Sequence, residues 1–420
     1  MRPVSNTPTE APTAIERVFY PPAPETWGRR ALLSPLSALS WPYAAAVHLR
    51  RALYDAGLLR AERVEGLRVI SVGNVNVGGT GKTPAVLHLA ELLVRAGHKV
   101  GILTRGYGRG SREPLSFTGS EPLPSVEDAG DEPLLLARRC PQARLFVGAD
   151  RVASAYRARD EFGLDTVLLD DGFQHRRLAR DEDLVVVDEA VGLGNGHMLP
   201  RGPLREPRSS LRRATLLWVR ASSSAADTST LAPGPELPAG RLPPGNPARA
   251  PQSMEATGPG VLAGRLPSGN PARAPTPMEA MGPDLPEARG VPRVRTRYRP
   301  TAWLEPSGRV LPTDTLAGQP VLALAGLARP GGFLRTLHSL GAEVRDAALF
   351  PDHHRFTADE LRDVESRAAR QGARVVTTEK DAVRLPPGFS AWVVRLGVEV
   401  LEGESHLRRA LGLADVPRDL

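Results

Sequence analysis

The chain has 420 residues, of which 41% are hydrophobic, and this length suffices for one large or two medium domains. Its single cysteine, Cys140, excludes an intrachain disulfide. The sequence contains no run of about 18 apolar residues, so no membrane-spanning helix is expected. The net charge of +7 favours an anionic partner, such as an anionic lipid or a phosphorylated substrate. No zinc knuckle or aromatic RNA-binding signature is present, so nothing in the sequence supports a nucleic-acid partner.

The first 60 residues divide into two segments. Residues 1–30 are polar and rich in Pro and Thr, which predicts a disordered tail without a secretory signal. Residues 31–60 are rich in Leu and Ala, and two prolines predict that they form short helical pieces. This segment also carries two aromatic and two basic residues, namely Trp41, Tyr43, Arg50 and Arg51. Either it packs on the domain as an ordinary amphipathic helix, or it lies in a membrane interface.

Residues 61–220 show an α/β pattern. Helical stretches at 82–97 and 150–162 separate several of the apolar runs. Such continuous apolar runs are typical of parallel strands buried on both faces, so a doubly wound, mostly parallel sheet is expected. The predicted strands are 67–73, 99–104, 144–148, 165–170, 183–188 and 214–219.

The pattern stops at residues 221–295, which are rich in Ala, Pro, Gly and Ser and repeat one motif, first at 239–251 and again at 263–275. A segment of this composition buries too little apolar surface to offset its ordering entropy, which predicts a disordered insertion. An α/β pattern resumes over residues 296–420 and predicts a second, smaller lobe. Its strands are expected at 294–300, 320–326, 373–378 and 392–398, and its helices at 330–340 and 357–371.

The sequence GNVNVGGTGKTP at 73–84 follows an apolar strand and opens a helix, which is the context of a P-loop. Backbone N–H groups there are expected to hold phosphate oxygens at a helix N-terminus. Lys82 is then predicted to reach the β- and γ-phosphates and Thr83 to bind Mg²⁺. One departure is that Asn76 stands where the usual pattern has glycine. The predicted nucleotide-binding residues are Asn76, Val77, Gly78, Gly79, Thr80, Gly81, Lys82 and Thr83.

Three further motifs carry charged residues. In DTVLLDDGFQH, an apolar strand ends at Asp170 and Asp171, which are either Mg²⁺ ligands or turn aspartates. In AGDEP, Asp131 is either part of a helix start or a base for a substrate hydroxyl. In FPDHHRF, a histidine pair has no third ligand at metal spacing, and the sharper interpretation is that His353 orients or tunes Asp131. The histidine of the first motif, His175, is either structural or a phosphate contact.

Taken together, these motifs resemble those of the tetraacyldisaccharide 4′-kinase family of lipid A biosynthesis. The motifs occur in order as PLSALS (35–40), GNVNVGGTGKTP (73–84), TRGYGR (104–109), AGDEP (129–133), DDGFQH (170–175), LPRGPLRE (199–206), AGLARP (325–330), FPDHHRF (350–356) and TTEKDAVR (377–384). The resemblance covers residues 33 to 413 apart from the insertion. It implies a P-loop lobe, a smaller C-terminal lobe with a cleft between them, and an N-terminal helix at the membrane interface.

The resemblance also implies the reaction: transfer of the γ-phosphate of ATP, with Mg²⁺, to the 4′-hydroxyl of tetraacyldisaccharide 1-phosphate. The expected location is the cytoplasmic face of the inner membrane, on its anionic surface, with no obligate protein partner. Asp131 is implied as the base and His353 as its aid, while Glu132 is a candidate to join the metal ligands. Residues implied to contact nucleotide or substrate phosphate are Arg105, Tyr107, His175, Arg201 and Arg205. Lys380 and Asp381 are implied to approach the region between the lobes, without an assigned role.

Two other classes of protein remain open on the sequence alone. A P-loop phosphotransferase that acts on a soluble small molecule explains the P-loop and the carboxylates, but it leaves residues 31–60 without a purpose. A P-loop ATPase or GTPase switch needs no base for a hydroxyl group, and the NKxD segment typical of GTP specificity is absent. Mutation of Asp131 distinguishes these classes, because a nucleotide switch keeps its hydrolysis without that side chain.

Overall fold

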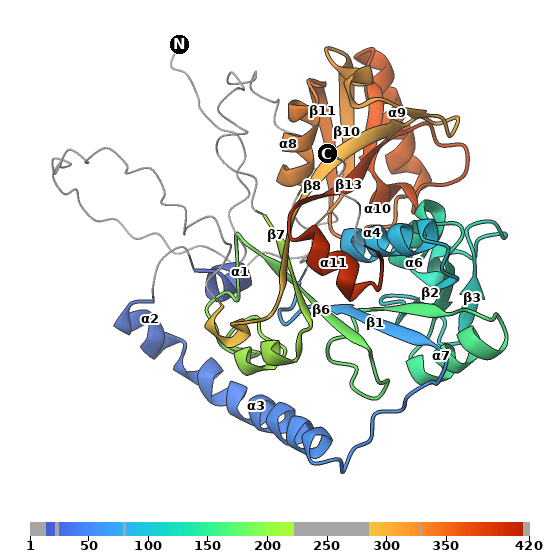
Figure 1. Ribbon diagram of the computed structural model, residues 1–420. Helices are drawn as coiled ribbons and strands as arrows, with labels where there is room; N and C mark the ends of the chain where they lie inside the picture. Colours follow the sequence, from blue (N-terminus) through green and yellow to red (C-terminus); the bar gives the residue numbers. More distant parts are fainter. Residues whose placement is uncertain (1–13, 22–24, 79–80, 222–284, 328–329, 415–420) are drawn as a thin grey trace, which may run out of the picture.

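The computed structural model describes residues 14–21, 25–78, 81–221, 285–327 and 330–414. Its centre is one sheet of 13 strands, in the order β11-β10-β12-β13-β8-β7-β6-β1-β5-β2-β4-β3, with β9 paired to β8. Figure 1 shows this sheet running through the whole molecule, with helices on its faces. The predicted insertion lies mostly in residues 222–284, outside the described residues, so its prediction stays untested.

The N-terminal half of the sheet is parallel except at its edge. Its strands are β1 (Arg68–Gly73), β2 (Val100–Thr104), β3 (Leu115–Phe117), β4 (Arg144–Val147), β5 (Thr166–Asp170), β6 (Glu182–Asp188) and β7 (Leu216–Arg220). All pairings among them are parallel except that of β3 with β4. Six of these seven strands were predicted from apolar runs, and the doubly wound α/β class is confirmed.

Helices cover both faces of this half. They are α4 (Lys82–Arg95), α5 (Val126–Ala129), α6 (Asp131–Arg139) and α7 (Arg151–Asp160). Side chains of α4 and α6 pack in one core with Ile70 of β1, whereas α7 packs in another core with its neighbour Val69. Successive residues of the strand therefore face opposite helical layers, as a buried parallel strand requires. Figure 1 shows α4 and α6 on one side of the sheet and α7 on the other.

The C-terminal half continues the same sheet. It contains β8 (Arg293–Leu304), β9 (Val310–Leu311), β10 (Pro320–Gly326), β11 (Glu343–Phe350), β12 (Arg374–Thr378) and β13 (Trp392–Glu402), with helices α8 (Gly331–Ser339), α9 (Ala358–Arg370), α10 (Glu379–Ala382) and α11 (Glu404–Ala410). Strand β8 pairs in parallel with β7 and antiparallel with β13. The two predicted lobes are thus joined through hydrogen-bonded strands, and β8 begins at Arg293, inside the range predicted as insertion.

The N-terminal segment differs from its prediction in two ways. Helices α1 (Ala14–Phe19) and α2 (Trp27–Leu32) occupy part of the segment that was predicted to be disordered. Helix α3 (Ser34–Asp55) is one helix of 22 residues, so the predicted division at the prolines is wrong. Pro35 lies in the first turn, where its missing N–H costs nothing, and the helix continues through Pro42.

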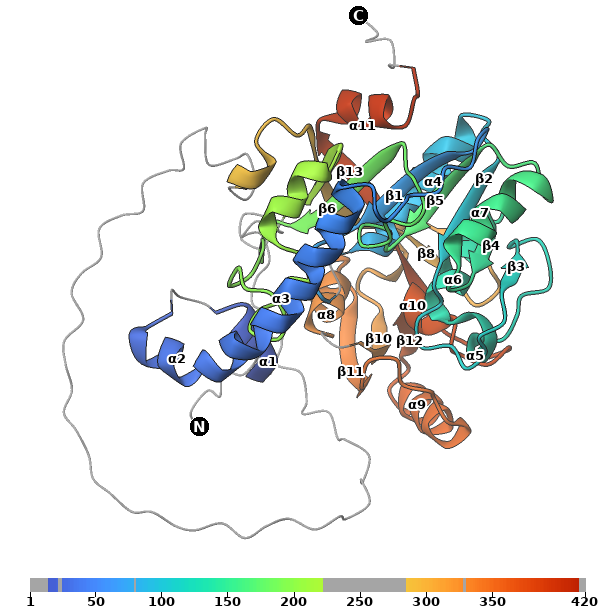
Figure 2. The same cartoon turned by 90° about the horizontal axis from the view of Figure 1, so that it is seen from below.

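Helix α3 lies across one side of the molecule, as Figure 2 shows. The Ser40 hydroxyl donates to the carbonyl oxygen of Met198 at 3.1 Å, and the Tyr43 hydroxyl donates to that of Arg205 at 2.9 Å. On the outer side Trp41 is 78% exposed, with Leu39 and Leu49 also exposed. The helix therefore both packs on the domain and presents an apolar surface. Within the described ranges, no helix is long and apolar enough to cross a membrane.

Candidate active site

A cleft of about 860 Å³ lies where β1, β2 and β5 end, at the edge where parallel sheets commonly bind ligands. Residues from the C-terminal half close its other side. Its lining consists of Arg50, Gly78, Gly81, Lys82, Thr83, Thr104, Arg105, Tyr107, Asp131, Glu132, Arg151, Asp170, Asp171, Gln174, His175, Arg205, Asp352, His353 and Lys380. The predicted P-loop, the acidic motifs and the histidine motif are therefore brought together in one place.

The P-loop enters α4 through Gly81, whose φ of 83° is left-handed and favours glycine. A Cβ atom on Gly81 would lie 2.6 Å from the ring of Tyr298, whose hydroxyl donates to the Gly81 carbonyl oxygen at 2.7 Å. The Lys82 Nζ donates to Asn74 Oδ1 at 3.2 Å and lies 3.4 Å from Asp171 Oδ1. Tyr298 of β8 thus supports the turn that carries Lys82. The P-loop motif alone did not reveal this contact.

Two of the predicted nucleotide-binding residues lie outside the cleft lining. Asn76 is buried, and its side-chain amide donates to the carbonyl oxygen of Gly192 at 2.9 Å. The Val77 N–H donates to the carbonyl oxygen of Pro203 at 2.8 Å. Both residues hold the start of the loop against the protein. Asn76 does not have a positive φ, so its backbone conformation does not require the usual glycine. Gly79 and Thr80 lie outside the described residues.

The two aspartates at the end of β5 have different surroundings. Asp170 is buried and accepts from the Thr104 hydroxyl at 3.1 Å, and burial together with the charge of Asp171 raises its pKa. Asp171 receives two hydrogen bonds from Arg205, at 2.8 and 2.9 Å. Although burial opposes ionisation, Arg205 and Lys82 hold the pKa of Asp171 well below its usual range. Asp171 is therefore ionised and neutralised by cations, whereas Asp170 lacks a full counter-charge.

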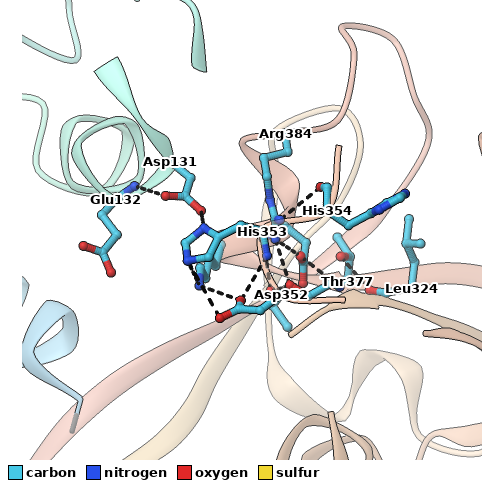
Figure 3. Close-up of polar contacts among 12 residues, drawn as sticks. Asp131, Glu132, Leu324, Asp352, His353, His354, Thr377 and Arg384 are labelled. Atoms are coloured by element: carbon cyan, nitrogen blue, oxygen red, sulfur yellow. Dashed lines mark hydrogen bonds and ion pairs between the residues drawn. The ribbon is translucent and has the colours of Figure 1, made fainter. Parts of the chain in front are cut away.

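Asp131 is the first residue of α6 and is buried against the C-terminal half. Its Oδ1 accepts from the Glu132 N–H at 3.0 Å, and its Oδ2 lies 2.9 Å from His353 Nδ1 (Figure 3). The other ring nitrogen of His353 lies 3.2 Å from Lys380 Nζ, which donates to Asp352 Oδ1 at 3.0 Å. The predicted Asp131–His353 contact is present between residues 222 positions apart in the sequence. Its role in catalysis stays a prediction.

Glu132 faces the cleft beside these groups. Burial, and then the charges of Asp170 and Asp131, raise its pKa to about 7. A cation bound beside Glu132 would favour its ionised form and lower this pKa. The raised pKa of Glu132 thus links the stability of the protein to pH.

Replacing Glu132 with glutamine is expected to stabilise the ligand-free protein more at pH 8 than at pH 5. The pKa of Glu132 is about 7 in the folded protein and takes the ordinary value of 4.5 in the unfolded chain. At a pH between these two values, the folded state holds a proton that the unfolded state has released. The free energy of unfolding therefore falls as pH rises through this window, by about 3 kcal/mol in all. Glutamine does not titrate, so the variant lacks this fall.

Urea denaturation with EDTA present, at pH 5 and pH 8, measures the difference. Glu365→Gln on the exposed side of α9 is the matched control, since that carboxylate is in water in both states. Equal pH dependence of wild type and Glu132→Gln would contradict the prediction.

The remaining predicted contacts fall into two groups. Arg105, Tyr107, His175 and Arg205 line the cleft, and burial together with nearby arginines lowers the pKa of His175 to about 4, so its ring is neutral at pH 7. Arg201 does not reach the cleft, which corrects its predicted contact: its guanidinium is buried and pairs with Glu25. Arg201 instead fastens the N-terminal segment to the loop that carries Arg205.

Several lining residues were not predicted as site residues. They are Arg50, Thr104, Arg151, Gln174, Asp352 and Lys380. Most of them lie next to or within the quoted motifs, and that adjacency was a usable signal. Arg50 comes from α3, where it donates to the Gln174 carbonyl oxygen at 3.0 Å, and only the docking of that helix brings it here.

The donor chemistry of the cleft suits Mg²⁺ bound together with phosphates. Among the residues that the structure describes, no group of three or more His, Cys, Asp or Glu is arranged to hold a metal ion. Mg²⁺ in kinases needs only one or two carboxylates, because substrate phosphates and waters complete its six ligands. Burial and neighbouring carboxylates raise the pKa of Asp170 and of Glu132 in spite of the nearby Lys82, so a bound cation would favour the ionised form of both side chains. The pairing of Asp171 with Arg205 makes it less available than these two.

Comparison with known proteins gives the family. The model of the family described as tetraacyldisaccharide-1-P 4′-kinase matches residues 30–257 and 236–412. A tetraacyldisaccharide 4′-kinase from Anaeromyxobacter sp. (strain Fw109-5) is 42% identical over 414 residues, which is 96% of either chain. The chain belongs to this family. It is therefore a kinase, and the family predicted from the motifs is confirmed.

More distant members of the tetraacyldisaccharide 4′-kinase family agree with this assignment. The protein of that name from Syntrophus aciditrophicus (strain SB) is 36% identical over 84% of each chain. A crystal structure of LpxK from Aquifex aeolicus in complex with ATP superimposes with a TM-score of 0.65 and 28% identity. The match covers 91% of this chain and 98% of that one, so the family resemblance includes both halves of the sheet.

Proposed function

We propose that this kinase transfers the γ-phosphate of ATP to the 4′-hydroxyl of tetraacyldisaccharide 1-phosphate, giving the bisphosphorylated disaccharide of lipid A biosynthesis. The observation that carries the proposal is the buried carboxylate of Asp131 in the cleft that also contains Lys82. A nucleotide switch needs no such base, whereas transfer to an alcohol does. ATP is the phosphate donor, as expected from the P-loop and from the ATP complex of the Aquifex aeolicus protein.

In this proposal the P-loop holds the phosphates. Gly81, Lys82 and Thr83 lie at the N-terminus of α4, where the helix dipole favours anions, and Gly78 also lines the cleft. Lys82 neutralises negative charge at the β- and γ-phosphates. Thr83, Asp170 and Glu132 would hold Mg²⁺, with Asp171 a further candidate if Arg205 turns to phosphate. Bound Mg²⁺ supplies additional neutralisation of the phosphate oxygens.

Asp131 is proposed to accept the proton of the 4′-hydroxyl. The hydroxyl oxygen bonds to the γ-phosphorus, the bond from that phosphorus to the β–γ bridging oxygen breaks, and ADP leaves with the electron pair. Two hydrogen bonds fix the orientation of the Asp131 carboxylate, one from its neighbour's N–H and one from His353. Such positioning is the main contribution that a protein makes to phosphoryl transfer.

The anionic part of the acceptor is proposed to meet the basic wall of the cleft. Arg50, Arg105 and Arg151 lie there beside the neutral His175, and within the described part of the chain none of these arginines forms an ion pair with a carboxylate. Guanidinium groups bind phosphate oxygens in pairs, so they suit both ATP and a sugar 1-phosphate. Tyr107 is 85% exposed at the mouth of the cleft and is a candidate contact for the sugar.

The acceptor carries acyl chains that leave a bilayer only at a cost of about 0.8 kcal/mol per CH₂, so the enzyme must reach it at the membrane. Helices α2 and α3 are proposed to lie on the anionic inner-membrane surface at its cytoplasmic face. Their exposed apolar side chains support this, and Arg50 of α3 connects that surface to the cleft. The exposed residues concerned are Trp27, Leu32, Leu39, Trp41 and Leu49.

Replacing Trp41 with alanine is expected to lower the partition coefficient of the protein onto vesicles about tenfold. Burial of a large apolar side chain is worth roughly 1.5–3 kcal/mol, and part of this is lost at an interface. Cosedimentation with vesicles that contain anionic phospholipid measures the effect. Val310→Ala, which removes an exposed apolar side chain from β9, is the matched control. Equal partitioning of the two variants would place the membrane contact elsewhere.

The proposed function is tested with purified protein, Mg²⁺, labelled ATP and detergent-dispersed tetraacyldisaccharide 1-phosphate. Label at the 4′ position supports the proposal, and the same acceptor with a 4′-deoxy sugar is the matched control. Transfer to water alone would indicate a nucleotide switch. Transfer only to a water-soluble sugar or nucleoside would indicate the soluble phosphotransferase class.

A further inference from the structure

Lys380 lies in the cleft without a role in the scheme above. It is the second residue of α10, and its Nζ lies 3.0 Å from Asp352 Oδ1 and 3.2 Å from His353 Nε2. The chain has 54 basic residues but only three lysines, and the cleft lining contains two of them. The contact of Lys380 with the histidine, which itself touches Asp131, is the feature to be explained.

The hydrogen-bonding capacities of the groups around His353 favour one position for the ring proton. An ammonium group has three donors and no acceptor, so His353 Nε2 must accept and carries no proton. The proton of the neutral ring is therefore on Nδ1, which lies 2.9 Å from Asp131 Oδ2. The contact with Asp131 favours the same arrangement, because carboxylate oxygens accept hydrogen bonds. The two neighbours contact different nitrogens of the ring, and both contacts favour the Nδ1–H form.

The surrounding backbone fixes this arrangement. His353 has a φ of 58°, a left-handed conformation that is uncommon for residues other than glycine. Asp352 Oδ1 accepts both from the His353 N–H, at 3.1 Å, and from Lys380. One carboxylate thus sets the position of the histidine backbone and of the ammonium group together.

Helix α10 is itself fastened to the histidine loop. The buried Asp381 side chain accepts from the Gly326 N–H at 3.1 Å and pairs with Arg384. Arg384 in turn donates to the His354 carbonyl oxygen at 3.1 Å (Figure 3). Lys380 is therefore presented to His353 from a rigid support, as a positioning residue requires.

We propose that Lys380 is a positioning residue that holds His353 as the neutral Nδ1–H tautomer. His353 then donates to Asp131 and keeps its proton throughout, so Asp131 alone takes the proton of the acceptor hydroxyl and becomes a carboxylic acid. The histidine orients the base and does not relay the proton. This inference rests on the proposed function for its catalytic meaning, whereas the tautomer itself is a property of the ligand-free protein.

The first experiment reads the tautomer without any reaction. The full chain is labelled with ¹⁵N-histidine, and two-bond ¹H–¹⁵N correlation spectra at pH 8 are compared for wild type, Lys380→Met and the control Lys99→Met. The signal of His353, one of nine histidines, is assigned by its absence in His353→Ala. The Nδ1–H pattern, with Nε2 unprotonated, is expected in wild type and Lys99→Met. In Lys380→Met no ammonium group faces Nε2, and that pattern is expected to be partly lost because Nε2 can then carry a proton. An Nε2–H pattern in wild type, or no change in Lys380→Met, would overturn the proposal.

The second experiment is a double-mutant cycle on kcat with the lipid acceptor. Lys380→Met is expected to lower kcat about tenfold in the wild-type background and less than about twofold in a His353→Ala background, because residues that act through one another are not additive. Lys380→Arg, which keeps a cation with donors only, is expected to recover part of the loss. Equal losses in both backgrounds would mean that Lys380 acts directly on substrate, and would overturn the positioning role. Because the spectra need no turnover, a failure of the proposed reaction is distinguished from a failure of this inference.

Discussion

Replacing Asp131 with asparagine is expected to lower kcat for phosphoryl transfer by about 10²- to 10⁴-fold, the range that general bases contribute. Asparagine keeps the size of the side chain and can still accept a hydrogen bond through its oxygen, but it takes no proton at neutral pH. The KM for ATP is expected to stay within about threefold, since the carboxylate contacts none of the P-loop residues that the structure describes.

The measurement is a steady-state assay with varied ATP and varied acceptor, together with thermal unfolding of each variant. Asp363→Asn on the exposed face of α9 is the matched control and should retain wild-type kcat. A kcat for Asp131→Asn within tenfold of wild type, in a folded protein, would remove Asp131 as the base. ATP hydrolysis that persists in the variant without transfer to lipid would instead separate nucleotide binding from the alcohol chemistry.

The parallel part of the sheet was predictable because its strands are buried on both faces. Strands such as β5 and β6 therefore appear as continuous apolar runs that no helix period explains. Strand β11 was missed, because its sequence EVRDAALF mixes charged and apolar residues at the outer edge of the sheet. Local sequence also gave no sign that β8 would pair with both β7 and β13, since strand pairing over long separations depends on the assembled fold.

The site residues that could be predicted are those in short sequence motifs, where neighbouring residues indicate the chemistry. Lys82 follows the buried strand β1, and the two aspartates stand at the end of β5, and the topology carries such strand ends to one edge. Side-chain direction was not predictable. Arg201 and Arg205 come from one motif, yet the first pairs with Glu25 and the second with Asp171. The role of Pro42 was misjudged for a related reason, because the contacts of α3 with the domain, such as those of Ser40 and Tyr43, are not visible in the local sequence.

Replacing Lys82 with methionine is expected to lower kcat/KM for ATP by on the order of 10²- to 10³-fold, as for removal of one preorganised group that stabilises transition-state charge. Methionine fills a similar volume without the ammonium. Asp171 keeps both hydrogen bonds from Arg205, so the end of β5 is expected to remain ordered in the variant. The substitution should therefore weaken the interaction with the phosphates and leave the fold unchanged.

Binding and turnover separate the two ways in which Lys82 could act. Calorimetric titration with a non-hydrolysable ATP analogue gives the loss of ground-state affinity, and kcat at saturating ATP gives the loss confined to the transition state. Because charge builds up on the bridging oxygen only as the γ-phosphate leaves, the larger part is expected in kcat. Lys99→Met, outside the cleft, is the control for the loss of one positive charge. A variant with wild-type kcat and weakened binding would confine Lys82 to holding the nucleotide, and Mg²⁺ with the arginines of the cleft would then have to supply the neutralisation during transfer.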